Sequence, residues 1–188
     1  MGEVPYGFKA LAERIAAQQR AFLGRKPHEP LPVREIAQHH GATVNYPEDE
    51  SGLTPATLSA LKAYPQCWSA ITVRTNEGPV ILNNPLHEDG RQNSNITHEI
   101  AHLILKHTPG ALQTVLGCVM RDFDEAQESE ASLLGEVLLV PRKALVWAAR
   151  GGMDVQSTAR WLGASEVLVR TRANRTGVKR QFQGSLVG

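Results

Sequence analysis

Residues 95–105 read Asn-Ile-Thr-His-Glu-Ile-Ala-His-Leu-Ile-Leu, and they contain the pentad His98-Glu99-Ile100-Ala101-His102. No Gly or Pro lies between Asn95 and Lys106, so this largely apolar segment is predicted to form one unbroken, buried helix. Two histidines four residues apart project from the same helix face and can hold one metal ion. Glu99 is placed to take a proton from a water molecule at that ion. The pattern H-E-x-x-H therefore indicates a zinc hydrolase.

The alternative interpretation is a surface helix whose two histidines bind no metal. The flanking residues argue against it, because Ile96 precedes the pentad and Leu103-Ile104-Leu105 follows it. Histidines on a buried helix need a polar partner, and one shared zinc ion would satisfy both. We therefore expect a metal site on this helix.

Composition limits the domain organisation and the classes of function. With 188 residues, 41% of them hydrophobic, the chain can bury one sizeable core with a small appended lobe, but not two large domains. A net charge of +1 excludes the strong field of a nonspecific nucleic-acid coat. Without a membrane-length apolar run or a secretory signal pattern, we expect a soluble, cytoplasmic protein. Cys67 and Cys118 lack C-x-x-C spacing and are expected to be free thiols.

Helical periodicity dominates the rest of the chain, with one region of strands. Helix formers and stop signals predict helices at residues 8–23, 33–39, 95–106, 124–140, 143–149, 155–162 and 165–174. Strands are predicted at residues 42–46, 68–73 and 79–83, the last two forming a hairpin. Residues 47–55 are predicted to be a loop, and residues 111–121 show no clear pattern. The predicted fold class is α+β, mostly helical, with a small antiparallel sheet.

A hydrolytic zinc ion takes three protein ligands, so a third ligand must come from elsewhere in the chain. On the helix predicted at residues 124–140, Glu128 heads a stripe of very small residues, namely Ala131, Ser132 and Gly135. Packing of this stripe on the H-E-x-x-H helix would bring Glu128 to the histidines. Glu130 lies on the neighbouring stripe and would reach the ion if the helix were rotated. We favour Glu128; the competing interpretation is that both acids are solvated charges that suit the helix dipole.

Two segments of the chain resemble the ImmA/IrrE-type metallopeptidases, a bacterial and phage family of the zincin class. One runs from Arg91 through the pentad to His107, and the other runs from Glu128 to Pro141. The resemblance implies a zincin-like metallopeptidase domain, which we assign to residues 1–142, followed by a C-terminal helical lobe at residues 143–188. It aligns Glu128 with the leading acid of the family motif. It also implies that the substrate is a transcriptional repressor of the helix-turn-helix type, cleaved in trans.

Three residues depart from the family pattern, in two places. Ser132 stands where the family usually has Asn or Asp, a group that in zincins can bond the free nitrogen of a ligand histidine. We therefore expect the contacts around the metal ligands to be built otherwise in this chain. Leu134 and Gly135 replace the usual Phe and Ala, a change that does not affect metal binding.

Together these residues predict a metallo-endopeptidase. His98, His102 and Glu128 would hold Zn2+, although Mn2+ or Fe2+ can share such ligands. Glu99 would take a proton from the attacking water and return it to the leaving amine. The strand at residues 68–73 or its partner would offer an edge to an extended substrate. Candidate donors to the oxyanion are His107, Tyr64, Arg170, Arg172 and Arg175.

A second hypothesis assigns a binding role to the C-terminal third. Residues 158–172 have the helix, Gly turn, helix pattern of a DNA-reading module, and residues 170–180 contain Lys179 and four arginines. The nearly neutral chain favours instead a small helical lobe with a solvated basic face. A third hypothesis is a regulatory protein that binds a repressor through a degenerate, non-catalytic metal site. None of the three requires a membrane.

Overall fold

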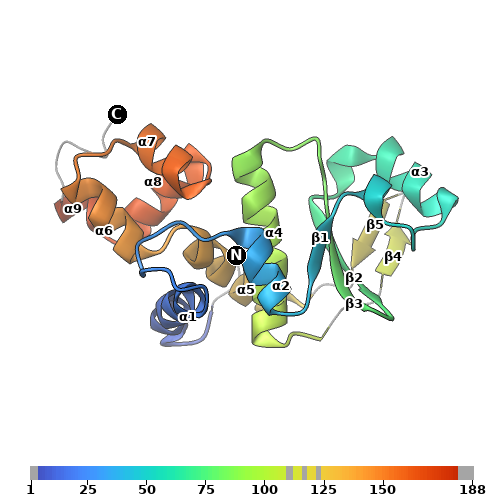
Figure 1. The fold of residues 1–188 in the computed structure, drawn as a ribbon, viewed down its shortest axis with the longest axis horizontal. Helices are drawn as coiled ribbons and strands as arrows, with labels where there is room; N and C mark the ends of the chain where they lie inside the picture. Colours follow the sequence, from blue (N-terminus) through green and yellow to red (C-terminus); the bar gives the residue numbers. More distant parts are fainter. Residues whose placement is uncertain (1–3, 109–111, 116–117, 122–123, 182–188) are drawn as a thin grey trace.

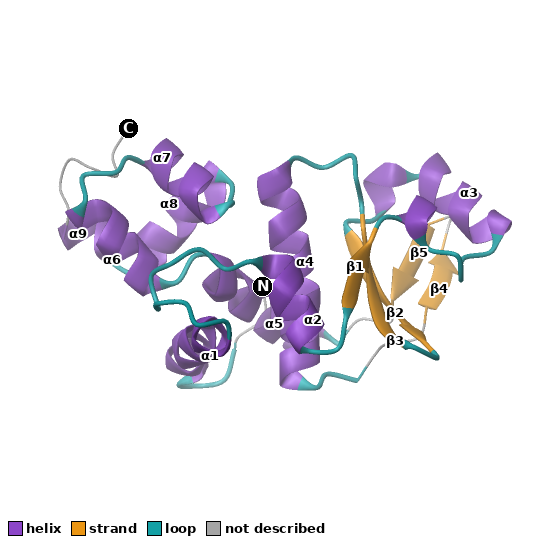
Figure 2. Cartoon of the chain, in the orientation of Figure 1, coloured by secondary structure: helices purple, strands orange, loops and turns teal. Residues whose placement is uncertain are grey.

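The computed structural model describes residues 4–108, 112–115, 118–121 and 124–181. Figure 1 shows strands at one end of the molecule, a central group of helices, and a helical lobe near the C-terminus at the other end. The described helices are α1 (Phe8–Phe22), α2 (Val33–His39), α3 (Pro55–Ala63), α4 (Asp89–Leu105), α5 (Glu125–Leu139), α6 (Arg142–Arg150), α7 (Val155–Leu162), α8 (Glu166–Arg175) and α9 (Val178–Gln181), with short 3-10 turns η1 (Pro47–Asp49) and η2 (Pro65–Cys67). The strands are β1 (Thr43–Asn45), β2 (Ala70–Thr75), β3 (Gly78–Asn83), β4 (Leu112–Val115) and β5 (Cys118–Arg121). The predicted fold class is confirmed, as the predominance of helix in Figure 2 makes plain.

The larger sheet has the strand order β1-β3-β2 and is mixed. β2 and β3 form the predicted antiparallel hairpin, in which Thr75 pairs with Gly78 beside the turn. β1 pairs with the other side of β3 in parallel, with Thr43 opposite Val80. The connection from β1 to β2 contains α3, and a connection of this length lets β1 pair with a strand that is not its neighbour in sequence.

Most of the predicted elements are present, but α3, β4, β5 and α9 were not predicted, and α4 starts earlier than predicted. α4 begins at Asp89, before the predicted start at Asn95. The N-cap of α3 is Thr54, whose side chain accepts a hydrogen bond from the backbone N–H of Thr57. β4 and β5 pair as an antiparallel hairpin in the region without a clear pattern. Strands of four residues are too short for a periodicity to stand out.

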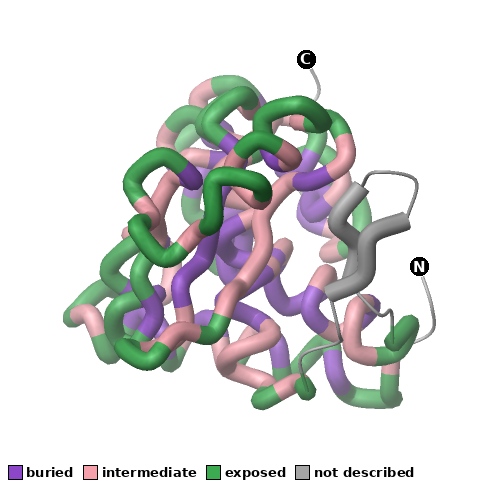
Figure 3. Tube along the Cα trace, turned by 90° about the vertical axis from the view of Figure 1, so that its right-hand side faces the viewer, coloured by how far each residue is buried: buried purple, intermediate pink, exposed green. Residues whose placement is uncertain are grey.

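α4 and α5 pack against each other at the centre of the fold. Ile100 of α4 and Leu134 of α5 are completely buried there, and Figure 3 shows buried segments running through the interior of the trace. Gly135 marks a close approach, since a β-carbon at this residue would lie 3.0 Å from both the backbone nitrogen and the α-carbon of His98. The small-residue stripe on α5 therefore lies against the helix that carries the pentad, as predicted.

Replacing Gly135 with alanine is expected to destabilise the protein by about 1–2 kcal/mol, because the backbone of α4 at His98 would have to move. In an ordinary helix interior the same change would stabilise by about 1 kcal/mol. Chemical denaturation of the metal-free protein measures the difference. Gly151→Ala is the matched control, since a β-carbon there would meet its nearest atom at an ordinary 3.4 Å. A Gly135→Ala protein as stable as the wild type would contradict the close packing.

The C-terminal helices are held to the core by a buried arginine. Arg172 of α8 is 4% exposed; it donates hydrogen bonds to the carbonyl oxygen of Val140 at 3.0 Å and to the carboxylate of Glu13 in α1 at 2.7 Å. Burial lowers the pKa of Arg172, and the nearby charge of Glu13 opposes that effect. This residue therefore joins the end of α5, α1 and α8. The division into domains at residues 142 and 143 stays a prediction.

Truncation of Arg172 to alanine is expected to destabilise the fold by about 3 kcal/mol, since it leaves Glu13 and the carbonyl of Val140 without this partner in a largely dry region. Arg170 on the same helix is half-exposed and pairs at the surface with Glu166 at 3.6 Å. Arg170→Ala is thus the matched control, with an expected change below about 0.5 kcal/mol. Thermal and urea unfolding of both variants test the difference. Equal losses in the free energy of unfolding would contradict a stabilising role of the Arg172 contacts.

Two expectations drawn from composition can be compared with the fold. The expectation of free thiols is wrong for Cys67, which is disulfide-bonded. Spacing in the sequence does not reveal which segments come together in space, and this limits what cysteine spacing can exclude. Within the described ranges, no helix has the length and apolar character needed to cross a bilayer.

Candidate metal centre

His98 and His102 of α4 meet Glu128 of α5 in one cluster. The two histidine Nε2 atoms are 3.1 Å apart. Oε2 of Glu128 lies 3.2 Å from Nε2 of His98, and Oε1 lies 3.4 Å from Nε2 of His102. Ligand atoms from the three residues all lie within 4.8 Å of one another. The three side chains thus point their donor atoms at a common centre.

The donor atoms lie close enough together to share one metal ion. With metal–ligand distances of about 2.0–2.2 Å, the donor atoms of a tetrahedral zinc site are separated by about 3.3–3.6 Å. The two histidine nitrogens are 3.1 Å apart, and they lie 3.2 and 3.4 Å from different oxygens of Glu128, so these separations are near that range. Two imidazoles and one carboxylate are a ligand set that hydrolytic zinc sites use, with a fourth position left for water or substrate. The residues present therefore fit a divalent metal ion.

The charge of Glu128 suits it to this position. The neighbouring imidazoles of His102 and His98 hold the pKa of the Glu128 carboxyl well below its usual range. The carboxylate is therefore ionised at neutral pH and available to a cation. It sits in the first turn of α5, which Asp124 caps by accepting hydrogen bonds from the backbone N–H groups of Ala126 and Gln127.

Glu130 makes a different contact. One of its carboxylate oxygens lies 3.2 Å from Nε2 of His107, and Nδ1 of His107 lies 3.0 Å from Nδ1 of His102. Glu128 therefore lies with both histidines, whereas the side chain of His107 separates Glu130 from them. The reason is helix phase: two residues along an α-helix turn the side chain by about 200°.

Glu99 points toward the sheet. This residue is 6% exposed, and its Oε2 accepts hydrogen bonds from the backbone N–H of Thr72 at 3.1 Å and from the hydroxyl group of Thr72. Thr72 belongs to β2, which packs on α4. Thr72 was not predicted as a partner of Glu99, because only the packing of the sheet on the helix brings the two residues together.

Comparison with known protein families decides the class of this domain. Residues 61–174 match the model of the M78 peptidases, which is described as the IrrE N-terminal-like domain. The chain belongs to this family. The matched M78 region contains the pentad and Glu128, and the resemblance inferred from the sequence is confirmed. None of the curated proteins compared with the chain matches it. Family membership and geometry together indicate a metallopeptidase with a candidate His, His, Glu metal site.

The remaining candidate residues of the M78 protein have other surroundings. Arg170, Arg172 and Arg175 each form an ion pair with a glutamate. Tyr64 is exposed at the end of α3. His107 contacts a residue of the metal cluster, because its Nδ1 lies 3.0 Å from Nδ1 of His102. Among the candidate oxyanion donors, the contacts of the described residues bring His107 to the site.

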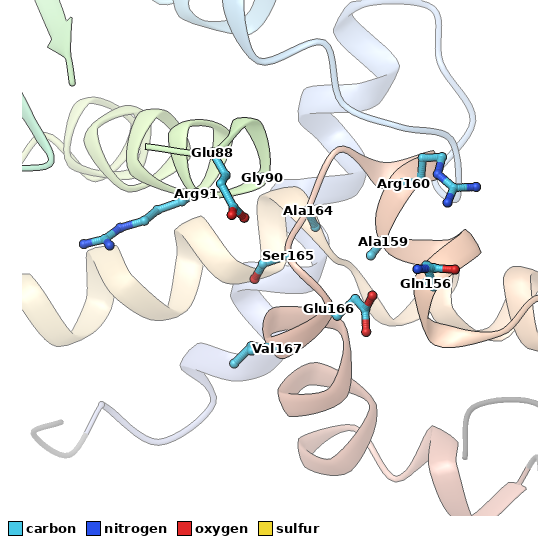
Figure 4. A pocket seen from close by; sticks show the side chains of 10 residues that line it. All are labelled: Glu88, Gly90, Arg91, Gln156, Ala159, Arg160, Ala164, Ser165, Glu166 and Val167. Carbon is cyan, nitrogen blue, oxygen red and sulfur yellow. The ribbon is translucent and has the colours of Figure 1, made fainter. Parts of the chain in front are cut away.

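The turn between α7 and α8 packs against the beginning of α4. Gly163 adopts a left-handed φ of 63°, which realises the predicted helix, Gly turn, helix arrangement. A β-carbon at Gly90 would lie 2.7 Å from the carbonyl carbon of Ala164, so a glycine is needed at this contact. A surface hollow of about 450 Å³ lies here. Figure 4 shows Arg91 and Arg160, two of its lining residues, on opposite sides. The three candidate metal ligands do not line this hollow, which is therefore separate from the metal centre.

Proposed function

We propose that this M78 domain is a zinc-dependent endopeptidase. The observation that carries the proposal is the convergence of His98, His102 and Glu128, whose ligand atoms all lie within 4.8 Å of one another. A buried glutamate, Glu99, follows one of these ligands directly in sequence and faces the neighbouring strand. A metal with three protein ligands and a glutamate base beside it is the arrangement that hydrolyses peptide bonds in metallopeptidases.

The chemistry follows from the residues present. A divalent metal held by the three side chains would polarise the scissile carbonyl and acidify water. Glu99 takes the proton of the attacking water and delivers it to the leaving amine. Thr72 holds one oxygen of Glu99 through two hydrogen bonds, which limits rotation of the carboxylate. A base positioned in this way contributes about 10²–10⁴-fold to the rate.

The proposed path of the substrate lies along β2. This strand is an outer strand of the three-stranded sheet (Figure 2), and the amide of Thr72 is directed at Glu99 and not across the hairpin. A peptide extended along this side of β2 would be held mainly through its backbone, without a strict sequence requirement. Its carbonyl groups would then pass beside Glu99 and the metal cluster.

The proposed substrate is a transcriptional repressor of the helix-turn-helix type, as the family resemblance suggests. The test is to incubate the Zn2+-loaded protein with the repressor encoded beside it and to map new termini by mass spectrometry. We expect one new pair of termini, which disappears with a chelator and returns when Zn2+ is added. Mn2+ and Fe2+ loading would show which ion supports the highest rate.

Other outcomes distinguish the alternatives. If casein is cleaved while the repressor stays intact, the domain is a peptidase but the repressor is not its substrate. Zn2+ binding without cleavage of either protein would reject the peptidase; calorimetric binding of the intact repressor would then favour the regulatory alternative. Duplex DNA binding with a steep salt dependence would point to a DNA-reading role for the α7–α8 region.

A further inference from the structure

We propose that His107 and Glu130 are positioning residues of the metal centre. They fix the tautomer and the ring orientation of His102, so that its Nε2 presents a lone pair to the metal. This inference rests on the proposed function of the cluster as a metal site. It assigns a role to an acid and a histidine that are not ligands themselves.

The contacts form a continuous chain from a carboxylate to a ligand. The side chain of His107 is only 8% exposed, and it lies between the other two members. Its Nε2 is 3.2 Å from Oε2 of Glu130, and its Nδ1 is 3.0 Å from Nδ1 of His102. The two imidazole rings meet edge to face, at 74° and with centroids 5.0 Å apart. Both nitrogens of His107 are therefore engaged by specific partners.

The direction of each hydrogen bond follows from the chemistry of the groups. A carboxylate only accepts, so the Nε2–H of His107 donates to Glu130. In a neutral imidazole the other nitrogen then accepts, and Nδ1 of His107 accepts from the Nδ1–H of His102. With its proton on Nδ1, His102 carries a lone pair on Nε2, the atom that faces His98 and Glu128. The hydrogen bonds from Glu130 through His107 to His102 thus select the tautomer of His102 that can bind a metal.

The backbone is bent to make this contact. α4 ends at Leu105, and Lys106 is the one non-glycine residue with positive φ in the described part of the chain, at φ 56° and ψ 37°. The backbone N–H of His107 then donates to the carbonyl oxygen of His102 at 3.0 Å. A left-handed backbone conformation is unfavourable for a residue other than glycine. The turn folds His107 back toward the last turn of α4, and its contacts offset that cost.

The contacts of His107 also account for the Ser132 departure from the family pattern. Ser132 stands where the family usually has Asn or Asp, so the partner of the free histidine nitrogen had to come from elsewhere. His107 supplies that partner for His102, and Glu130 orients His107 in turn. Outer partners of this kind typically change metal affinity by about 10–100-fold.

The test measures Zn2+ affinity of the full chain by competition with a chromogenic chelator. His107→Leu is expected to weaken binding by about 10–100-fold. His107→Asn should recover part of that loss, because an amide oxygen near the position of Nδ1 can accept from His102. Glu130→Ala should weaken binding as well, and the double variant His107→Leu/Glu130→Ala should be no worse than His107→Leu alone. His39→Asn and Glu125→Ala are controls that should bind Zn2+ like the wild type.

Two further measurements separate positioning from a merely structural role. The visible absorption of the Co2+-loaded protein should change in His107→Leu, because the ligand ring is no longer held. Thermal unfolding of the metal-free variants reports any loss of fold independently of metal. Wild-type affinity in His107→Leu, or additive effects in the double variant, would overturn the inference. Failure of the wild-type protein to bind Zn2+ or Co2+ would instead refute the proposed metal centre and this inference with it.

Discussion

Replacing Glu99 with glutamine is expected to lower peptide cleavage by about 10³-fold while the metal stays bound. The amide has nearly the shape of the carboxylate, and its oxygen can still accept both hydrogen bonds from Thr72. It cannot take a proton from the attacking water, so the base is lost while the surroundings are kept. The measurement is the rate of repressor cleavage together with the Zn2+ content of the purified variant.

Thr72→Val is the informative companion to Glu99→Gln. It removes the hydroxyl donor to Glu99 while the backbone N–H remains, so we expect a rate reduced far less than in Glu99→Gln. Retained hydrolysis in Glu99→Gln at normal Zn2+ content would contradict the assignment of Glu99 as the base. Loss of zinc from that variant would show that Glu99 acts on metal binding instead.

Truncating Glu128 to alanine is expected to weaken Zn2+ binding by more than a hundredfold. Loss of a residue that only contacts a ligand typically weakens metal binding by about 10–100-fold. Glu128 is the anionic member of the cluster, with its oxygens 3.2 and 3.4 Å from the histidine nitrogens. Without it two neutral imidazoles remain, and cleavage should disappear together with the metal. Competition with a chelator gives the affinity, and the same sample gives the cleavage rate.

Two acids of the same helix serve as comparisons for Glu128. Glu125 is exposed in the first turn of α5 and should bind no metal, so Glu125→Ala is expected to behave like the wild type. Glu130→Ala should have an intermediate effect, since Glu130 acts through His107. If Glu128→Ala kept zinc and Glu130→Ala lost it, Glu130 would be the metal ligand and Glu128 would not.

The sequence was informative wherever a local pattern carries the chemistry. The pentad predicts its helix and two ligands because spacing on a helix determines which side chains share a face. α2 has the predicted bounds, and α1, α5 and α7 match theirs within a residue or two, because cap residues and periodicity agree there. The small-residue stripe ending at Gly135 correctly indicated which face of α5 meets α4.

Local pattern was insufficient wherever a contact joins distant segments. β1 pairs with β3 in parallel, although the strand prediction gave a simple antiparallel sheet. Cys67 is disulfide-bonded despite spacing that suggested free thiols. Arg172 was considered as an oxyanion donor or a DNA contact, and it is buried against α1 and α5. In each case the partner lies far away in sequence, where periodicity carries no information.

The sequence alone predicted one helix with a candidate metal-binding pair and a candidate base, and it left Glu128 and Glu130 as candidates for the third ligand. The tertiary structure groups Glu128, and not Glu130, with the two histidines, because that grouping depends on how α5 is rotated against α4. The packing of α5 on α4 also placed Glu130 on His107, and the packing of β2 on α4 placed Thr72 on Glu99. Helix geometry is local and can be read along a chain, whereas the rotation and contact of packed elements follow from the whole core.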